Sequence, residues 1–239
     1  MNIVVTGASR GVGYQAALNF SRNRDHVVFA LSRNEAGLKK LLEESQSATL
    51  VPIHCDLADL QSIHAAVKEI EGRVKSIEVL VNNAGSLLLK DFSELTMEDW
   101  KEVFAVNVFG VAELTRQLLP LLKRGNLAEK EGVHAHVVNI ASMGGIQGSL
   151  KFKGLSAYSS SKGALITMTE CMSEELKAEG IRVNCVALGS VETEMFKQAF
   201  PGYEASSKAE EIGAWLEDFG VHGFSFFNGK TIQLSTSTP

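Results

Sequence analysis

Two side chains that could perform acid–base chemistry lie four positions apart: the phenol of Tyr158 and the ammonium of Lys162. If this segment is helical, both side chains project from one face and reach a common point. In water a phenol ionises near pH ~10 and a lysine near ~10.4. A fixed positive charge favours the phenolate, so we expect Lys162 to lower the pKa of Tyr158. A tyrosine tuned in this way can give a proton to a carbonyl oxygen or take one from an alcohol.

This spacing alone is weak evidence, because two half-exposed helix residues would give the same pattern. The elements around the pair therefore decide its meaning. An apolar strand over 134–141 ends at Ser142, a glycine-rich loop covers 143–155, and a helix is expected over 157–179 with Gly180 as its left-handed cap. Tyr158 and Lys162 then fall on the first turns of that helix, just after the loop that follows Ser142.

The N-terminus carries a second chemical pattern, a glycine-rich turn between an apolar run over 2–6 and an amphipathic stretch. The turn reads Thr6-Gly7-Ala8-Ser9-Arg10-Gly11-Val12-Gly13. Its glycines allow a sharp bend and let a phosphate approach the backbone, and the helix that follows offers free N–H groups to an anion. A plain tight turn is the alternative. The position of the turn, inside the first βα unit of an α/β chain, favours nucleotide binding.

The second strand, expected over 26–31, ends without the acidic residue that commonly holds the ribose hydroxyls of NAD. Ser32 and Arg33 follow it, and Arg10 sits in the glycine turn. Two arginines that converge where a 2′-phosphate would lie predict NADP over NAD. The alternative is that both arginines are simply solvated.

Two amide-bearing segments complete the candidate site. The fourth strand, over 77–81, runs into Asn82-Asn83-Ala84-Gly85, and small or amide residues past a strand's carboxyl end suit a ligand crevice. Asn107 lies among apolar residues within a long helical pattern over 96–123. A buried asparagine must find partners, so Asn107 is either a satisfied core amide or part of the site.

Strands and helices alternate along the whole chain without a linker or an internal repeat. This order predicts one doubly wound α/β domain over 1–239. The other expected elements are helices over 34–45 (N-capped by Asn34), 60–71 and 208–219, and strands over 50–54, 181–187 and 231–234. An apolar segment over 195–203 resembles a substrate flap, with limits at about 193–206. We expect the last residues, 235–239, to be frayed.

Composition excludes several classes of protein. The chain has 239 residues, 45% hydrophobic, with a formal net charge of -5, which argues against nucleic-acid binding. No apolar run reaches the ~18 residues of a membrane span, and no signal peptide precedes the first strand. The scattered cysteines Cys55, Cys171 and Cys185 lack metal-ligand spacing and indicate a reduced, cytoplasmic setting. His134 and His136 share a strand face but lack a third ligand, so no metal is expected.

Together these motifs resemble the short-chain dehydrogenases/reductases over nearly the full length. The matching positions are the turn from Thr6 to Gly13, Asp56-Leu57, Asn82-Asn83-Ala84-Gly85, Asn107, Ser142, and Tyr158 with Lys162. The resemblance implies a Rossmann fold with a central seven-stranded parallel sheet. It also implies a catalytic tetrad formed by Asn107, Ser142, Tyr158 and Lys162.

The resemblance further implies a role for each residue. Tyr158 would be the acid/base, Lys162 would lower its pKa and hold the nicotinamide ribose, Ser142 would polarise the substrate oxygen, and Asn107 would anchor a water that links Lys162 to solvent. The implied cofactor-binding residues, besides Tyr158 and Lys162, are Gly7, Ser9, Arg10, Gly11, Val12, Gly13, Arg33, Asp56, Leu57, Asn83, Ala84, Gly85, Gly189, Val191 and Thr193. Among them Asp56 would bind the adenine edge, 83–85 the adenosine ribose side, and Val191 with Thr193 the carboxamide.

Three departures from the family pattern are visible. Leu188 stands where a proline usually precedes the glycine, and the frequent Asp-Gly-Gly near the C-terminus is missing. Ser142 and Tyr158 are 16 positions apart, longer than usual, and the extra residues near 148–154 include Lys151, Phe152 and Lys153. We expect this longer loop to reshape the substrate entrance.

The sequence thus predicts an NADPH-dependent reductase of a ketone, nearest in look to 3-oxoacyl-(acyl-carrier-protein) reductases. Its substrate would be a small-molecule or acyl-thioester carbonyl, with neither nucleic acid nor membrane as partner. The alternatives are a non-catalytic NADP-binding redox sensor and an NAD(P)-dependent alcohol dehydrogenase working in the oxidative direction. By resemblance, the helices over 96–123 and 157–179 would pair in a homodimer or homotetramer.

Overall fold

A parallel sheet of seven strands forms the centre of the computed structural model, which describes residues 1–236. The strands are β1 (Asn2–Thr6), β2 (Val27–Ser32), β3 (Leu50–His54), β4 (Val79–Asn82), β5 (Ala135–Ser142), β6 (Ile181–Leu188) and β9 (Thr231–Leu234). Their order is β3-β2-β1-β4-β5-β6-β9, and every neighbouring pair is parallel. The expected doubly wound Rossmann fold is confirmed. The end of the frayed tail expected over 235–239 lies outside the described residues.

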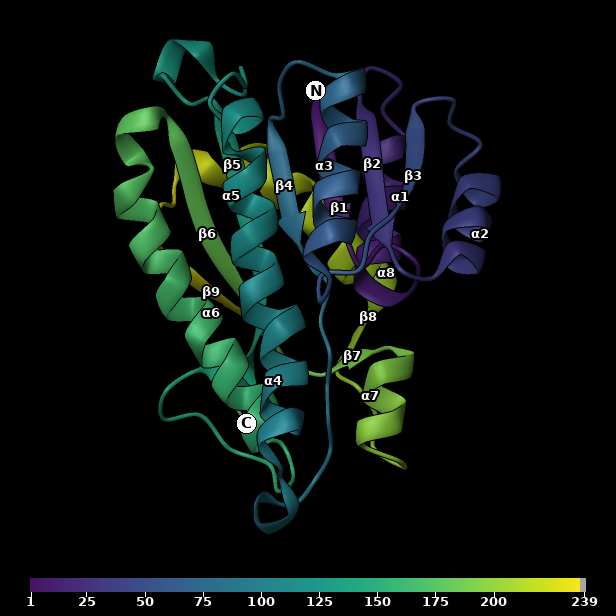
Figure 1. The fold of residues 1–239 in the computed structure, drawn as a ribbon, viewed down its shortest axis with the longest axis vertical. Helices are drawn as coiled ribbons and strands as arrows, with labels where there is room; N and C mark the ends of the chain where they lie inside the picture. The colour runs from purple at the N-terminus through teal and green to yellow at the C-terminus, as the bar shows by residue number, and fades with distance from the viewer. Residues whose placement is uncertain (237–239) are drawn as a thin grey trace.

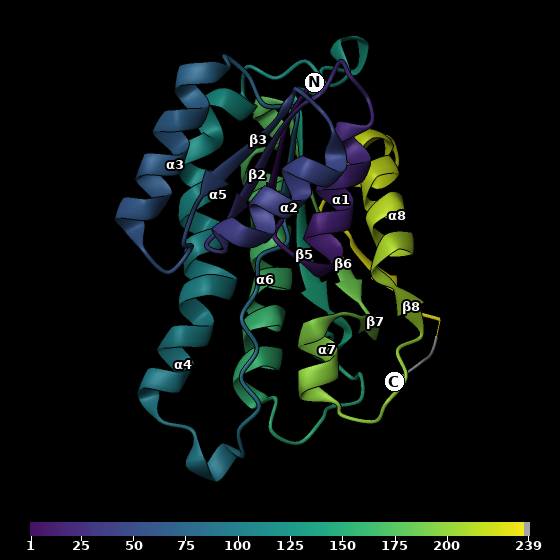
Figure 2. The same ribbon diagram turned by 90° about the vertical axis from the view of Figure 1, so that its right-hand side faces the viewer.

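Helices cover both faces of the sheet because its central strands are apolar on both sides. One face carries α1 (Gly11–Ser21), α2 (Glu35–Ser45) and α8 (Ala209–His222), and the other carries α3 (Leu60–Arg73), α5 (Gly110–Leu122) and α6 (Ser156–Glu175). Figure 2 shows the sheet between these two layers, with α1 and α8 side by side. No helix among the described residues is long and apolar enough to cross a membrane.

The helix expected over 96–123 is not a single regular helix. It consists of α4 (Met97–Phe104), a π-helical turn (Ala105–Phe109) and α5, with Asn107 inside the π turn. Its start is a capping box, in which Thr96 and Asp99 bind each other's backbone N–H groups. Single π turns inside α-helices are frequent at functional sites. The sequence pattern missed this turn because its apolar spacing still fits a helix.

Two predicted end signals are confirmed. The Asn34 side chain caps α2 by accepting from the backbone N–H of Gly37 at 3.0 Å. Helix α6 passes into a short 3₁₀ turn (Lys177–Glu179), and Gly180 follows with a φ of 71°. A residue without Cβ takes this left-handed conformation without steric cost.

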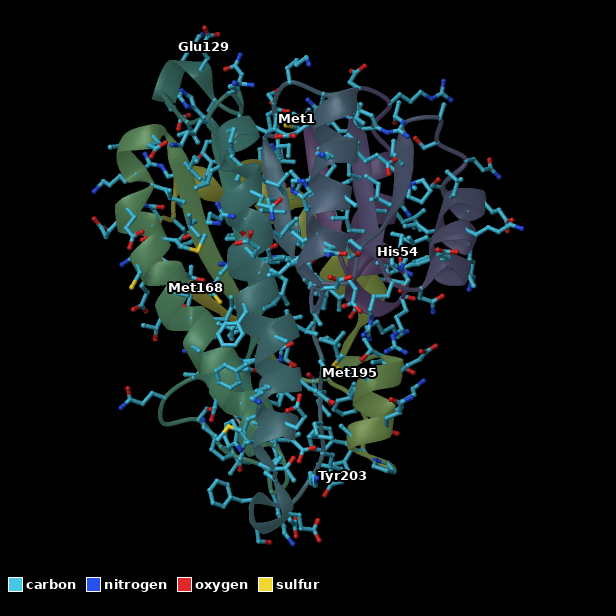
Figure 3. All side chains as sticks on the ribbon, viewed as in Figure 1. Met1, His54, Glu129, Met168, Met195 and Tyr203 are labelled. Atoms are coloured by element: carbon cyan, nitrogen blue, oxygen red, sulfur yellow. The ribbon has the colours of Figure 1, made fainter. Side chains whose placement is uncertain are left out.

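A small second sheet lies beyond the carboxyl ends of the main strands. Here β7 (Val191–Glu192) pairs in parallel with β8 (Ser207–Lys208), and α7 (Glu194–Ala199) lies between them in the chain. Ser190 and Ser206 add hydrogen bonds beside this ladder, such as Ser206 N–H to Ser190 Oγ at 3.0 Å. Figure 1 shows α7 below the end of the sheet, and Figure 3 labels Met195 and Tyr203 on this segment. The apolar segment expected as a flap therefore contains a helix whose base is closed by a strand pair.

Candidate active site

The glycine turn forms a cradle at the start of α1. Gly7 and Gly11 have φ values of 67° and 58°, in the left-handed region that favours glycine. A Cβ on Gly7 would lie 2.8 Å from the Cα of Ala84, and one on Gly13 would lie 2.2 Å from Asn83 Nδ2. Helix α1 has no acidic residue in its first turn, so its positive end faces no carboxylate of its own. These features fit the pyrophosphate of a dinucleotide.

Thr6 joins this cradle to the segment that follows β4. Its Oγ1 accepts hydrogen bonds from the backbone N–H groups of Asn83 and Ala84, both at 3.0 Å. In return, Asn83 Nδ2 donates to the carbonyl oxygen of Thr6 at 3.0 Å. The segment that was expected to line a crevice therefore also holds the glycine turn in place, from a position 77 residues further along the chain.

Both predicted phosphate-binding arginines line the cavity beside the cradle, but each faces a carboxylate. Arg10 pairs with Glu194 of α7 at 2.8 Å, and Arg33 lies 3.7 Å from Asp56. The side chains of the first pair are 55% and 67% exposed, and exposed ion pairs contribute only about 0–1 kcal/mol. A phosphate can therefore replace the Glu194 carboxylate at little cost, and the exposed guanidinium of Arg33 lies 3.7 Å from its carboxylate, which leaves it able to contact a phosphate as well.

Thr193, expected near the carboxamide, is the N-cap of α7. Its side chain accepts from Phe196 N–H at 3.2 Å, and its Cγ2 would lie 3.2 Å from a Cβ on Gly11. Gly189 follows β6, where its N–H donates to the carbonyl oxygen of Leu234 at 3.0 Å. The backbone hydrogen bond that follows Leu188 thus forms without the proline usual in the family.

Ser142 ends β5 with its hydroxyl directed toward Tyr158. Its Oγ accepts from the backbone N–H of Gly144 at 3.2 Å, which leaves the hydroxyl proton free to be donated. The Ser142 side chain also acts as a hydrogen-bond partner of the Tyr158 phenol and lowers its pKa. The hydroxyl groups of Ser142 and Tyr158 can thus both form hydrogen bonds with a single oxygen atom of a substrate in the cavity.

Burial raises the pKa of Tyr158, and the hydrogen bond with Ser142 offsets this only in part. The pKa of Tyr158 is therefore raised rather than lowered as expected, and Lys162 is not among the causes of the shift. The Nζ of Lys162 donates to the carbonyl oxygen of Ile140 at 2.8 Å and lies 5.9 Å from the centre of the tyrosine ring. The phenol therefore stays protonated at neutral pH, as a proton donor requires.

Lys162 itself is only 3% exposed, and burial lowers its pKa to about 8. A low-polarity environment disfavours the charged ammonium. The same burial that keeps Tyr158 protonated thus brings Lys162 close to losing its proton at working pH.

Asn107 is fully buried, and its amide is hydrogen-bonded on both sides. Its Oδ1 accepts from Ser86 N–H at 2.7 Å, and its Nδ2 donates to the Ser86 carbonyl and to Ser161 Oγ, both at 2.9 Å. Ser161 Oγ in turn donates to the carbonyl oxygen of Tyr158 at 2.7 Å. Asn107 thus positions the first turn of α6, and its role in holding a water stays a prediction.

These groups surround one cavity of about 620 Å³ at the carboxyl end of the sheet. This volume lies within the ~300–1,000 Å³ usual for small-molecule and cofactor sites. All the predicted site residues line it except Gly13 and Asn107, which lie behind its wall. The sequence did not indicate the partner of Arg10 or the serine beside Asn107, namely Glu194 and Ser161, and it gave Thr6 no role of its own. The aromatic lining comes from the longer loop and the apolar flap that were expected, with Phe152, Phe196, Phe200 and Tyr203. Ser161 and Thr6 sit inside recognised motifs, whereas Glu194 carries no local signal.

His134 and His136, the pair considered for metal binding, lie in different environments. His136 is fully buried, with Nδ1 3.0 Å from the carbonyl oxygen of Gly220 and Nε2 3.0 Å from Asn184 Nδ2. His134 lies outside β5 and is partly exposed. Within residues 1–236 there is no group of three His, Cys, Asp or Glu side chains arranged to hold a metal ion.

The chain is similar to known proteins over most of its length. A family model described as short chain dehydrogenase matches residues 1–204. The 5-keto-D-gluconate 5-reductase of Escherichia coli K12 is 32% identical over 221 residues, which cover 90% of this chain and 78% of that protein.

Solved structures share the fold over nearly the whole chain. The 3-ketoacyl-(acyl-carrier-protein) reductase of Brucella melitensis, complexed with NADH, superposes with a TM-score of 0.84 at 23% identity and covers 97% of this chain and 95% of its own. A Shigella flexneri protein complexed with NADP has a TM-score of 0.85 at 26% identity and covers 97% and 95%.

Proposed function

The chain belongs to the short-chain dehydrogenase family, and from that premise we propose that it is an NADPH-dependent reductase that converts a ketone into a secondary alcohol. Oxidoreduction between carbonyl and alcohol with a nicotinamide cofactor follows from the family. The direction, the preference for NADPH and a 3-oxoacyl-type or related carbonyl as substrate are the proposed parts. The observation that carries the proposal is that Ser142, Tyr158 and Lys162 line one cavity together with the glycine turn.

Each residue would act on the carbonyl oxygen or hold another residue in place. Ser142 would turn its hydroxyl proton to the substrate oxygen in a hydrogen bond. Tyr158 would transfer its proton as the oxygen gains negative charge. The bound cofactor would supply the hydride. Lys162 would hold its positive charge near this oxygen and near the ribose, and Asn107, through Ser161, would keep α6 in register.

The Tyr158→Phe variant, compared with the unchanged protein, tests this assignment. We expect Tyr158→Phe to lower kcat for the reduction of β-ketoesters roughly 10²–10⁴-fold, the usual contribution of a positioned acid. The measurement is the consumption of NADPH. Cofactor affinity, followed by fluorescence, should change little. A non-catalytic redox sensor would instead bind NADPH with no turnover in the unchanged protein.

The preference for NADPH rests on Arg10 and Arg33, whose guanidinium groups are exposed and can contact a phosphate. A charge-assisted hydrogen bond contributes about 1.5–3 kcal/mol. We therefore expect Arg33→Ala to weaken NADPH binding roughly 10- to 100-fold and NADH binding far less. Arg116→Ala, which removes an arginine outside the cavity, is the control. Equal losses for both cofactors would contradict the assignment.

A further inference from the structure

Four aromatic rings form a bridge across the solvent side of the cavity. Phe152 comes from the long loop between Ser142 and Tyr158, whereas Phe196, Phe200 and Tyr203 come from α7 and the residues after it. The rings of Phe152 and Phe200 meet edge to face, 5.1 Å apart and inclined at 67°. Phe200 also lies 5.3 Å from Phe196 and 6.3 Å from Tyr203. This aromatic bridge lines the same cavity as the proposed catalytic groups.

The loop on one side of the bridge is fixed rather than free. Lys151 Nζ donates to the carbonyl oxygen of Ile146 at 2.6 Å, and Lys153 pairs with Asp91 at 2.9 Å. The carbonyl oxygen of Gly154 accepts from Lys90 N–H at 2.9 Å. Residues before and after Phe152 are therefore held, and its ring is directed toward Phe200. The extra residues of this loop thus supply a positioned aromatic wall.

Charge at this end of the cavity opposes an anionic substrate. Among the described residues that line the cavity, the cations are Arg10 and Arg33 at the glycine turn and Lys162, which is bonded to Ile140. The ammonium group of Lys151 is hydrogen-bonded within its own loop, and that of Lys153 pairs with Asp91. Near the bridge the cavity is lined by the carboxylate of Glu204. Glu204 is exposed, so a carboxylate or phosphate on the substrate would meet a like charge there and would gain no cationic partner from the described residues that line this end of the cavity.

We infer that the preferred substrate is an uncharged ketone that carries an aryl group, with the aryl arm against the aromatic bridge and the carbonyl oxygen at Ser142 and Tyr158. This rests on the proposed function, because it takes these two residues to bind the carbonyl. Aromatic pairs favour edge-to-face contact and contribute beyond their buried area, about as much as a tenfold change in affinity. Leu155 and Met143 extend the apolar lining.

Three matched substrates test the inference with NADPH: ethyl benzoylacetate (aryl), ethyl acetoacetate (methyl) and the acetoacetate anion. We expect kcat/KM roughly tenfold higher for the aryl ester than for the methyl ester, and lowest for the anion. Phe152→Ala and Phe200→Ala should remove most of the aryl preference through KM. The control Phe226→Ala truncates an 83% exposed ring outside the cavity. It should leave kcat/KM for the aryl ester and for the methyl ester unchanged.

Binding measurements separate this inference from the proposed function. Calorimetry with the NADP⁺-loaded protein, unchanged or with Phe152→Ala, compares the two esters without turnover. An aryl preference of roughly tenfold that disappears in Phe152→Ala supports the inference even if no ketone is reduced, in which case only the proposed function fails. Equal affinity or equal kcat/KM for the two esters in the unchanged protein overturns it. So does an equal loss for both esters in Phe152→Ala.

Discussion

At the scale of residues, the site depends on one physical effect acting on two groups in opposite directions. Burial disfavours charge, so it raises the pKa of the Tyr158 phenol and lowers that of the Lys162 ammonium to about 8. Lys162 is not among the causes of the shift in the Tyr158 pKa. Its charge is held instead by the carbonyl oxygen of Ile140.

This arrangement predicts a pH dependence. Lys162 is charged below its pKa and neutral above it, so kcat/KM for reduction should fall as pH rises through about 8. Lys162→Arg keeps its charge to far higher pH. We expect this variant to be less active but to lose the fall near pH 8. A profile measured from about pH 6 to 10 that stays flat in the unchanged protein would contradict the role of this ammonium.

At the scale of elements, the site is positioned by close backbone contacts between loops rather than by side chains alone. The glycine turn, the segment after β4 and the first turn of α1 meet where Gly13 has no room for a Cβ. On the other side of the cavity, the π turn places Asn107 against Ser86 and Ser161. Each contact joins segments that are far apart in the chain.

Gly13→Ala tests the first of these contacts. The added methyl group would lie 2.2 Å from Asn83 Nδ2 and 2.5 Å from the carbonyl oxygen of Gly7, so the backbone must shift. We expect a loss of about 1–3 kcal/mol in the free energy of unfolding and at least roughly tenfold weaker NADPH binding. The control Gly72→Ala in α3 meets nothing within 4 Å. It should raise stability by up to about 1 kcal/mol and leave cofactor affinity unchanged.

At the scale of the whole molecule, a buried polar group ties β5, β6 and α8 together. His136 Nδ1 lies 3.0 Å from the Gly220 carbonyl of α8, and its Nε2 faces the amide of Asn184 on β6. Asn184 Oδ1 accepts from Lys230 N–H at 3.1 Å, which fixes that amide with its NH₂ toward the ring. These contacts fit a neutral histidine, and burial lowers its pKa to about 4.

Global stability should therefore depend on pH through this residue. Between pH 6.5 and about 4 the unfolded chain binds a proton at His136 that the folded chain does not, so the free energy of unfolding falls as pH falls. The full effect is about 3 kcal/mol. Denaturant unfolding of His136→Phe should show a weaker dependence over this range, with some remaining because burial also lowers the pKa of His26. His222→Gln, at an exposed histidine, should keep the slope of the unchanged protein.

Much of the fold could be predicted from the sequence because its signals are local. Apolar periodicity located the strands and helices, Asn34 and Gly180 marked helix ends, and the alternation of elements required a parallel sheet. The site residues after each strand also followed, because the carboxyl ends of parallel strands meet at one edge. The sequence did not indicate the short β7–β8 ladder or the π turn. A ladder of two paired residues, or one extra residue in a single helical turn, is too short to change the apolar periodicity.

The amino-acid sequence by itself determined which chemical groups the protein has and the edge of the sheet at which they gather. Only the tertiary structure decided their charge states and their partners. Arg10 meets Glu194 across 184 positions, Phe152 meets Phe200 from another segment, and the pKa of Tyr158 is raised by burial that distant segments create together. Burial and long-range contact arise only when distant segments pack together. The local sequence therefore identifies the candidate site residues, but it does not contain the environment that sets their pKa values and their partners.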